Sequence, residues 1–341
     1  MQYSMLLWPH ANARYQQETR NLAVAELRLA LQRVAPEASV AIDEAADMPC
    51  LAIDCPDRLS ERAVAAIRGQ SLLYQLFERR EDGSLLPVAG RAAAAVGDDL
   101  PAILKYKGKT NEMFLQLLLN VALWSSDFWD EAGPLHFYDP MCGRATAPFI
   151  ALNRGWEAVG ADVDRTDLKE AEKFFKRYLE YHRFKHATAR ASRTCKGGRP
   201  APLTRFDVTA GAGKVSLDLV ELDAARSGEA FSKNTFHLIA CDLPYGVRHD
   251  AQPGQSVPKG GNWLEALLKK ALPGWRGILK PGGAVALSFN AQTFKRDRLR
   301  GLMADAGFEV LADGPYDGFG HWVEQAITRD IVVGRKVTSG G

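Results

Sequence analysis

Short apolar runs alternate with helical segments along the second part of the chain, and this alternation constrains the fold more than any other feature. The runs that read as buried strands are Leu135–Tyr138, Ala158–Val163, Phe236–Ala240 and Ala284–Phe289, with Phe308–Leu311 and Ile327–Val333 as closing strands. Strands buried on both faces and joined by helices form a parallel sheet with helices on each side. The pattern therefore predicts an open α/β sheet of about seven strands.

Two further segments belong to this expected domain, which we place at residues 101–336. Asn111–Ser125 has a broad apolar face and is expected to be a helix that precedes the first strand. Residues around Leu203–Val208 read as the third strand, which ends in Asp207.

Residues 1–100 read as a separate small α+β domain. Strands are expected at Tyr3–Trp8, Pro49–Asp54 and Ser71–Arg79, with helices at Gln17–Val34 and Leu59–Arg68 between them. The order is compatible with a ferredoxin-like module. A chain of 341 residues also favours two domains over one.

Composition narrows the classes of protein. The 5 cysteines are an odd number and form no CxxC pair, so we expect neither a disulfide framework nor a metal site. The start of the chain lacks the pattern of a signal peptide, and no apolar stretch is long enough to cross a bilayer. We therefore expect a cytoplasmic protein. A net charge of +2 permits a polyanionic partner without requiring one.

Candidate ligand-binding residues follow the expected strands, where open α/β sheets collect their ligands. The first strand is followed by Asp139-Pro-Met141-Cys-Gly143-Arg-Ala145-Thr146, in which small residues allow a tight turn and a helix N-terminus offers N–H groups. The second strand ends in Asp162 and Val163, about 20 residues later, at the spacing of a ribose-binding acid, with Asp164 as an alternative to Asp162. Asp207, with Val208 beside it, is placed to accept a hydrogen bond from an adenine amino group.

Each of these signals also has a simpler interpretation. A glycine turn often only separates a strand from a helix, and an Asp after a strand is often an N-cap. The order and spacing of the signals together favour a nucleoside-containing cofactor. Two observations argue against NAD or FAD as that cofactor. The turn lacks GxGxxG, and Asp139 would repel a pyrophosphate but would tolerate a sulfonium cation and an amino group.

The fourth strand is followed by Asp242-Leu243-Pro244-Tyr245, a tetrapeptide suited to amine chemistry. The Asp242 carboxylate and the Leu243 carbonyl are placed to accept the two N–H bonds of an exocyclic amine and to orient its nitrogen. Pro244 stiffens the turn, and Tyr245 offers a flat face to an unpaired or flipped-out base. The simpler alternative is an ordinary turn after a strand, since Pro and Gly favour turns.

Asp139-Pro-Met-Cys-Gly143 together with Asp242-Leu-Pro-Tyr-Gly246 resembles the THUMP-associated tRNA guanine-N2 methyltransferases and their eukaryotic tRNA relatives. The helix Asn111–Ser126 and the ending Glu324–Lys336 are similar to that group as well. The resemblance covers roughly residues 100–336. It implies a Rossmann-like class I fold, S-adenosylmethionine as cofactor, and methylation of guanine N2 in tRNA.

The chain departs from that family in two places. The family usually has a triplet such as Gly-Ser-Gly where this chain has Gly143-Arg144-Ala145. The N-terminal region is also short for a ferredoxin-like module plus a complete THUMP domain. The rival hypotheses are a DNA adenine-N6 or cytosine-N4 methyltransferase and a non-catalytic nucleic-acid-binding module.

Two more segments have a functional and a plain interpretation. Lys105–Glu112 is either a loop over the methionine end of the cofactor, with Thr110 and Asn111 as ligands, or a linker with a helix cap. The stretch Lys169–Arg205 is rich in basic and aromatic residues and is either an RNA contact or a solvated helix face. Its second half, Ala187–Pro202, reads as a loop.

Overall fold

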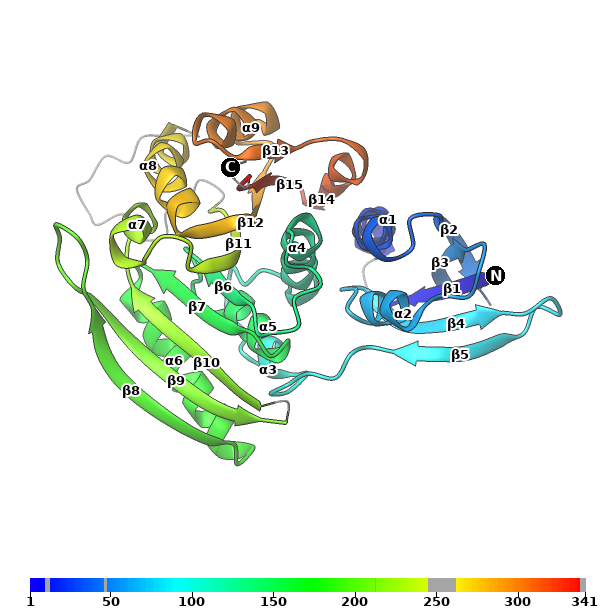
Figure 1. Cartoon of the computed structure of the whole chain (residues 1–341), viewed down its shortest axis with the longest axis horizontal. Coiled ribbons are helices and arrows are strands. Elements are labelled where there is room, and N and C mark those ends of the chain that lie inside the picture. The colour runs from blue at the N-terminus through cyan, green and yellow to red at the C-terminus, as the bar shows by residue number, and fades with distance from the viewer. Residues whose placement is uncertain (10–12, 46–47, 212, 245–261, 338–341) are drawn as a thin grey trace. The chain divides into compact units, whose positions relative to one another are not determined.

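The computed structural model describes residues 1–9, 13–45, 48–211, 213–244 and 262–337, which divide into two compact units (Figure 1). The smaller unit comprises residues 1–93 and 312–331, and the larger comprises residues 94–311 and those from 332 onward. The segment 312–331, which the sequence pattern alone assigns to the second domain, thus groups with the N-terminal residues.

The smaller unit is built around an antiparallel sheet. Its elements are β1 (Gln2–Leu7), α1 (Ala13–Val34), β2 (Ser39–Ala45), β3 (Met48–Asp54), α2 (Glu61–Arg68), β4 (Leu73–Arg79) and β5 (Leu85–Gly90). The strand order β2-β3-β1-β4-β5, with antiparallel neighbours, is the ferredoxin-like order extended by β5. The segment 312–331 adds η2 (Gly314–Phe319) and β14 (His321–Glu324).

The larger sheet has ten strands within the described residues. Its parallel strands are β6 (His136–Asp139), β7 (Glu157–Asp162), β10 (Gly213–Glu221), β11 (Phe236–Asp242) and β12 (Leu279–Asn290). One edge continues through β15 (Ile327–Arg335) to β13 (Glu309–Leu311), and β14 pairs with the start of β15. The other edge continues through β9 (Ala201–Ala210) to β8 (Lys185–Arg193).

The chain proceeds from β6 through β7 to β10 on one side and from β11 to β12 on the other. The strand order therefore reverses between β6 and β11, and such a switch point leaves a crevice at the carboxyl ends of the two strands. The fold class expected from the sequence, a Rossmann-like α/β sheet together with a separate small α+β domain, is confirmed.

Helices cover both faces of the larger sheet (Figure 1). One face carries α4 (Glu112–Ser125), α5 (Thr146–Asn153) and α6 (Arg165–Tyr181), with the short α3 (Leu100–Ile103) packed against α5. The other carries η1 (Ala224–Arg226), α7 (Ser227–Ala230), α8 (Asn262–Ile278) and α9 (Arg296–Asp305). None of the helices in the described part of the chain has the length and apolarity that a membrane crossing requires.

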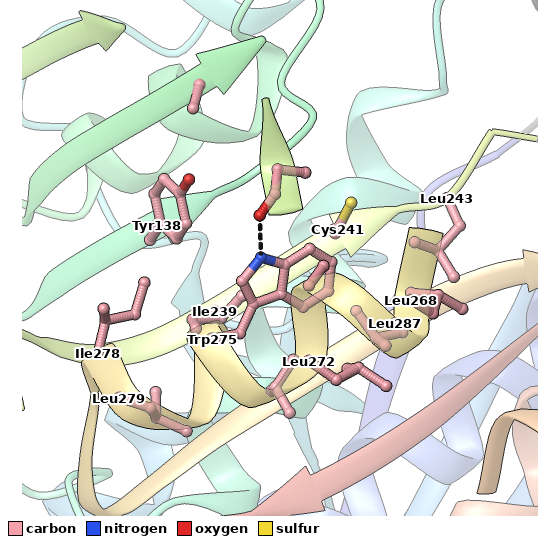
Figure 2. Packing of buried hydrophobic residues seen from close by; sticks show 14 of the residues in the cluster. Tyr138, Ile239, Cys241, Leu243, Leu268, Leu272, Trp275, Ile278, Leu279 and Leu287 are labelled. Atoms are coloured by element: carbon pink, nitrogen blue, oxygen red, sulfur yellow. Dashed lines mark hydrogen bonds between the residues drawn. The ribbon is translucent and has the colours of Figure 1, made fainter. Parts of the chain in front are cut away.

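The core under α8 is centred on Trp275, which is fully buried among residues of β11 and β12 such as Ile239 and Leu287 (Figure 2). The Trp275 indole N–H donates a 3.0 Å hydrogen bond to the carbonyl of Ala224. A buried indole needs such a partner, and here the bond ties α8 to η1. Leu243, directly after β11, belongs to the same core, so the residue beside Asp242 is held by packing.

The expected third strand is wrong in its placement. The strand parallel to β7 is β10, with Glu221 paired to Asp162, whereas β9 runs antiparallel to β10. Asp207 pairs with Ser216, five residues before the carboxyl end of β10, which is roughly 16 Å along the strand. The prediction failed because both segments have strand-like patterns and the pattern does not report strand direction.

The expected loop at residues 187–202 is also wrong over most of its length. Residues 185–193 form β8, which pairs with β9 from Lys185–Thr209 to Arg193–Ala201. The strand is mostly exposed and consists of small and basic residues, so it lacks the apolar pattern from which a strand is recognised. β8 forms because its backbone pairs with that of β9.

Candidate active site

Three carboxylates lie at the carboxyl ends of neighbouring parallel strands. Asp139 ends β6, Asp162 ends β7 and Asp242 ends β11. Asp139 and Asp242 therefore flank the switch point, and Asp162 lies one strand farther along. The sequence predicts these three acids at this edge, together with Asp207, which the structure places elsewhere.

The turn after β6 brings the chain from Asp139 into α5. Gly143 and Ala145 both have left-handed backbone angles, with φ of 50° and 64°. The Cys142 N–H donates to the Ala161 carbonyl at 2.9 Å, and the Gly143 N–H donates to Asp162 Oδ2 at 2.8 Å. Because L-residues pay about 1–2 kcal/mol for this conformation, Ala145 stores backbone strain at the start of α5.

Asp162 and its neighbours have distinct local roles. Each Asp162 oxygen accepts one backbone N–H at 2.8 Å, from Gly143 and from Asp164, and a carboxylate retains further lone pairs for a ligand. Asp164 is the N-cap of α6 and accepts the N–H groups of Thr166 and Asp167. Val163, between the two acids, is 59% exposed, an open apolar surface at the strand end.

The electrostatics of the cluster favour a cation. Burial, with smaller contributions from Asp162 and Asp242, raises the pKa of Asp139 to about 8 although the Met141 N–H donates to its carboxylate. Burial also raises the pKa of Asp162. Within the described residues no basic side chain forms an ion pair with Asp139. A positively charged ligand would supply the missing counter-charge.

Asp242 is held by two hydroxyl groups. Thr110 Oγ1 donates to Asp242 Oδ2 at 2.5 Å, and Ser288 Oγ from β12 donates to Oδ1 at 2.7 Å. The Leu243 N–H donates to the Ser288 carbonyl at 2.8 Å. These hydrogen bonds orient the carboxylate. Pro244 follows within the described residues, and Tyr245 lies outside them.

The segment before α4 bears on both of the alternatives predicted for residues 105–112. Asn111 is the N-cap of α4, and its side chain accepts the N–H groups of Met113 and Phe114, as the helix-cap alternative expects. Thr110, by contrast, reaches the carboxylate of Asp242. Tyr106, in the same segment, lies under the Arg144 guanidinium at 4.6 Å from the ring centroid and bonds to Thr146.

The structure does not bring Asp207 and Val208 to this edge. The carboxyl end of β10 is instead followed by Leu222, whose N–H donates to the Asp162 carbonyl, and by Asp223. The sequence reasoning also missed Ser288, although a polar residue inside the apolar run of β12 is a usable signal.

A glycine in β7 tests how tightly the turn packs. A Cβ at Gly160 would lie 2.8 Å from Cys142 Sγ and 2.9 Å from Pro148 Cγ. We expect Gly160→Ala to displace the turn and to lower the free energy of unfolding by about 1–3 kcal/mol. Gly301→Ala in α9, where nothing lies within 4 Å of the new Cβ, should instead raise it by about 0.5–1 kcal/mol. Thermal denaturation of both variants checks this, and equal stability of the two contradicts it.

Comparison with known proteins gives structural likenesses only. No family model and no curated protein matches the sequence. TrmN from Thermus thermophilus is 14% identical, with a TM-score of 0.46, over 99% of this chain and 100% of that one. A candidate RNA methyltransferase from Pyrococcus horikoshii is 16% identical, with a TM-score of 0.41, over 71% and 94%. Magnesium protoporphyrin IX methyltransferase from Synechocystis, solved with bound SAM, is 13% identical, with a TM-score of 0.38, over 70% and 90%.

Proposed function

We propose that the protein is an S-adenosylmethionine-dependent methyltransferase that acts on an exocyclic amine of an RNA base, namely guanine N2 in tRNA. The observation that carries the proposal is the arrangement of Asp139 and Asp242 on either side of the switch point. A buried acid without an ion-pair partner among the described residues ends one strand, and an oriented acid followed by Leu-Pro ends the other.

The residues after β6 and β7 fit the cofactor. The ionised form of Asp139 suits the cationic amino group and sulfonium of S-adenosylmethionine. The N–H groups at the start of α5 suit its carboxylate, Asp162 suits the ribose hydroxyls, and Val163 offers an apolar surface to the adenine ring. When bound, S-adenosylmethionine supplies an electrophilic methyl group.

The residues after β11 fit the amine. Asp242 accepts one N–H of the exocyclic amino group and the Leu243 carbonyl accepts the other, which directs the nitrogen lone pair towards the methyl group. The carboxylate also stabilises the positive charge that develops on nitrogen during transfer. Thr110 and Ser288 hold Asp242 in one orientation. After transfer the excess proton leaves to solvent.

RNA is the proposed substrate class for two reasons. The motif pair resembles enzymes of tRNA, and an exposed basic segment extends one edge of the larger sheet. The exocyclic amine of a flipped-out DNA base, or an amino group of a protein side chain, would also offer N–H bonds to Asp242, so these substrates are the alternatives that an experiment must separate.

Calorimetric titration with S-adenosylmethionine tests the cofactor, and transfer of a labelled methyl group to unmodified tRNA, rRNA and DNA tests the substrate. We expect binding with one site per chain and label in tRNA, recovered as N2-methylguanosine after digestion. Failure of the folded protein to bind S-adenosylmethionine, alone or with tRNA present, would overturn the assignment. Label in DNA alone would overturn the substrate.

A further inference from the structure

Positive charge is concentrated in one segment of the chain. The protein has 43 Lys and Arg against 41 Asp and Glu. Residues 182–206 contain seven of the basic residues and none of the acidic ones, so the remainder of the chain is net acidic. The basic residues are Arg183, Lys185, Arg190, Arg193, Lys196, Arg199 and Arg205. We call residues 182–206 the basic hairpin, because they include β8, the connection to β9 and the first part of β9.

The basic hairpin forms the outer edge of the larger sheet (Figure 1). β8 pairs on one side with β9, and within the described residues no strand pairs with its other side. Its central residues are small and exposed, namely Ala187, Thr188, Ala189, Ala191 and Ser192. Backbone N–H groups and basic side chains are therefore both accessible along this edge.

Two of the arginines form ion pairs within the protein. Arg193 and Arg205 each donate to Asp218 at 3.2 Å, and the Arg193 guanidinium lies 4.7 Å from the Phe231 ring centroid. The outer cations differ. The Arg190 side chain is 86% exposed and its Glu172 partner is 3.9 Å away. Lys185 and Lys196 are exposed, and neither forms an ion pair with a described residue.

The tip of the basic hairpin is anchored to its neighbours. Cys195 is buried, the Lys196 N–H donates to the Glu229 carbonyl at 3.1 Å, and Arg226 donates to the Arg199 carbonyl at 3.0 Å. The exposed cations are therefore presented on a fixed scaffold, which lowers the entropy lost when a partner binds.

Charge argues against a second copy of this chain as the occupant of the edge. Pairing of two β8 strands would bring together two segments that carry basic residues and no acidic residue. Like charges directly opposite each other destabilise a strand pair. A polyanion meets the same row of cations favourably and releases counterions on binding.

We propose that the basic hairpin is the surface on which the substrate RNA lays its phosphate backbone, an inference that rests on the proposed function and adds where the RNA is held. Between β11 and β8 the strand order β11-β6-β7-β10-β9-β8 has five steps, or about 24 Å. This is shorter than the roughly 34 Å of one turn of a DNA duplex, a scale on which one nucleic-acid molecule spans both places. A structured RNA can therefore touch the basic hairpin while one of its bases reaches Asp242.

The test compares two triple variants of the full chain. Lys185→Gln, Arg190→Gln and Lys196→Gln remove three charges from the basic hairpin, whereas Lys233→Gln, Lys270→Gln and Lys295→Gln remove three exposed charges elsewhere on the larger unit. Binding to a fluorescent, unmodified tRNA transcript is measured over a salt series. We expect the hairpin variant to bind roughly ten- to a hundredfold more weakly, with a slope of log K against log salt that is shallower by about 2.

The control variant should bind tRNA as the wild type does, and both variants should bind S-adenosylmethionine unchanged. Equal tRNA binding by the hairpin variant and the wild type would overturn the inference, and so would equal losses in the two variants. A wild type that binds S-adenosylmethionine but binds duplex DNA or an acidic protein in place of tRNA would overturn it too, while leaving the methyltransferase assignment intact. A wild type that does not bind S-adenosylmethionine would instead count against the proposed function.

Discussion

Replacing Asp242 by Asn is expected to lower the rate of methyl transfer on the order of a thousandfold, with almost no change in the affinity for S-adenosylmethionine. The amide keeps the size of the carboxylate, but it removes the negative charge opposite the developing ammonium. It also turns one acceptor into a donor that faces the N–H bonds of the substrate. The change is therefore expected to act on the transition state and to spare the cofactor, for which we propose the ends of β6 and β7 as the binding site.

Single-turnover methyl transfer to tRNA, with calorimetry for the cofactor, measures the two quantities separately. Thr110→Val and Ser288→Ala serve as graded comparisons, because each removes one of the hydroxyl groups that orient Asp242 and leaves its charge. Both should retain more activity than Asp242→Asn. If Asp242→Asn stays within tenfold of the wild type, Asp242 does not contact the amine.

Replacing Asp139 by Asn is expected to weaken the binding of S-adenosylmethionine by about a hundredfold or more at pH 8. The amide lacks the negative charge with which the cationic ligand would pair. In the wild type, burial raises the pKa of Asp139 to about 8 in the free protein. A cationic ligand binds the ionised form, so binding releases a proton below pH 8. In the wild type the affinity should rise roughly fiftyfold from pH 6 to pH 8 and then level off.

The raised pKa of Asp139 also makes the stability of the free protein depend on pH, in the direction opposite to that of the ligand affinity. Asp139 holds its proton in the folded chain up to about pH 8, but the unfolded chain loses it near pH 4. The free energy of unfolding therefore falls as the pH rises from about 4 to about 8. Asp139→Asn removes this pH-dependent loss of stability, but the buried amide leaves some of its own hydrogen bonds unmade. The free variant should therefore be about 2–4 kcal/mol more stable than the wild type at pH 8.

Calorimetry in buffers of different ionisation enthalpy and denaturation at several pH values check these two results. Asp164→Asn is the matched control, because it removes a charge at the same edge while Asn caps α6 as well as Asp does. It should change neither quantity by much. A wild-type affinity that is flat between pH 6 and pH 8 would show that Asp139 is already ionised before the ligand arrives.

The buried parallel strands could be predicted from the sequence because their own residues specify them. β11 and β12 are buried on both faces, and a continuous apolar run reports that directly. The exposed edges could not be predicted. β8 consists of residues such as Ala, Thr and Arg that gain little from burial, and β5 contains Pro87, which argues against a strand. These strands depend on a neighbour's hydrogen bonds.

The candidate site divides in the same way. Asp139, Asp162 and Asp242 could be found because the ends of parallel strands converge by construction, so their position in the strand pattern places them. The contact between Thr110 and Asp242 joins residues that are 132 positions apart. It depends on how α4 packs against β11 and β12, which the periodicity of the helix does not specify.

The return of residues 312–331 to the smaller unit sets the order in which a newly made chain can fold. There α1 packs against η2, and the Trp322 N–H donates to Glu18 at 3.3 Å. β15 then passes from the smaller unit into the larger sheet, between β13 and β12. At a synthesis rate of roughly 5–20 residues per second, α1 waits on the order of 15–60 seconds on the ribosome for η2. Neither unit is complete until residues 312–335 have been made, so the two units mature only after this segment has left the exit tunnel.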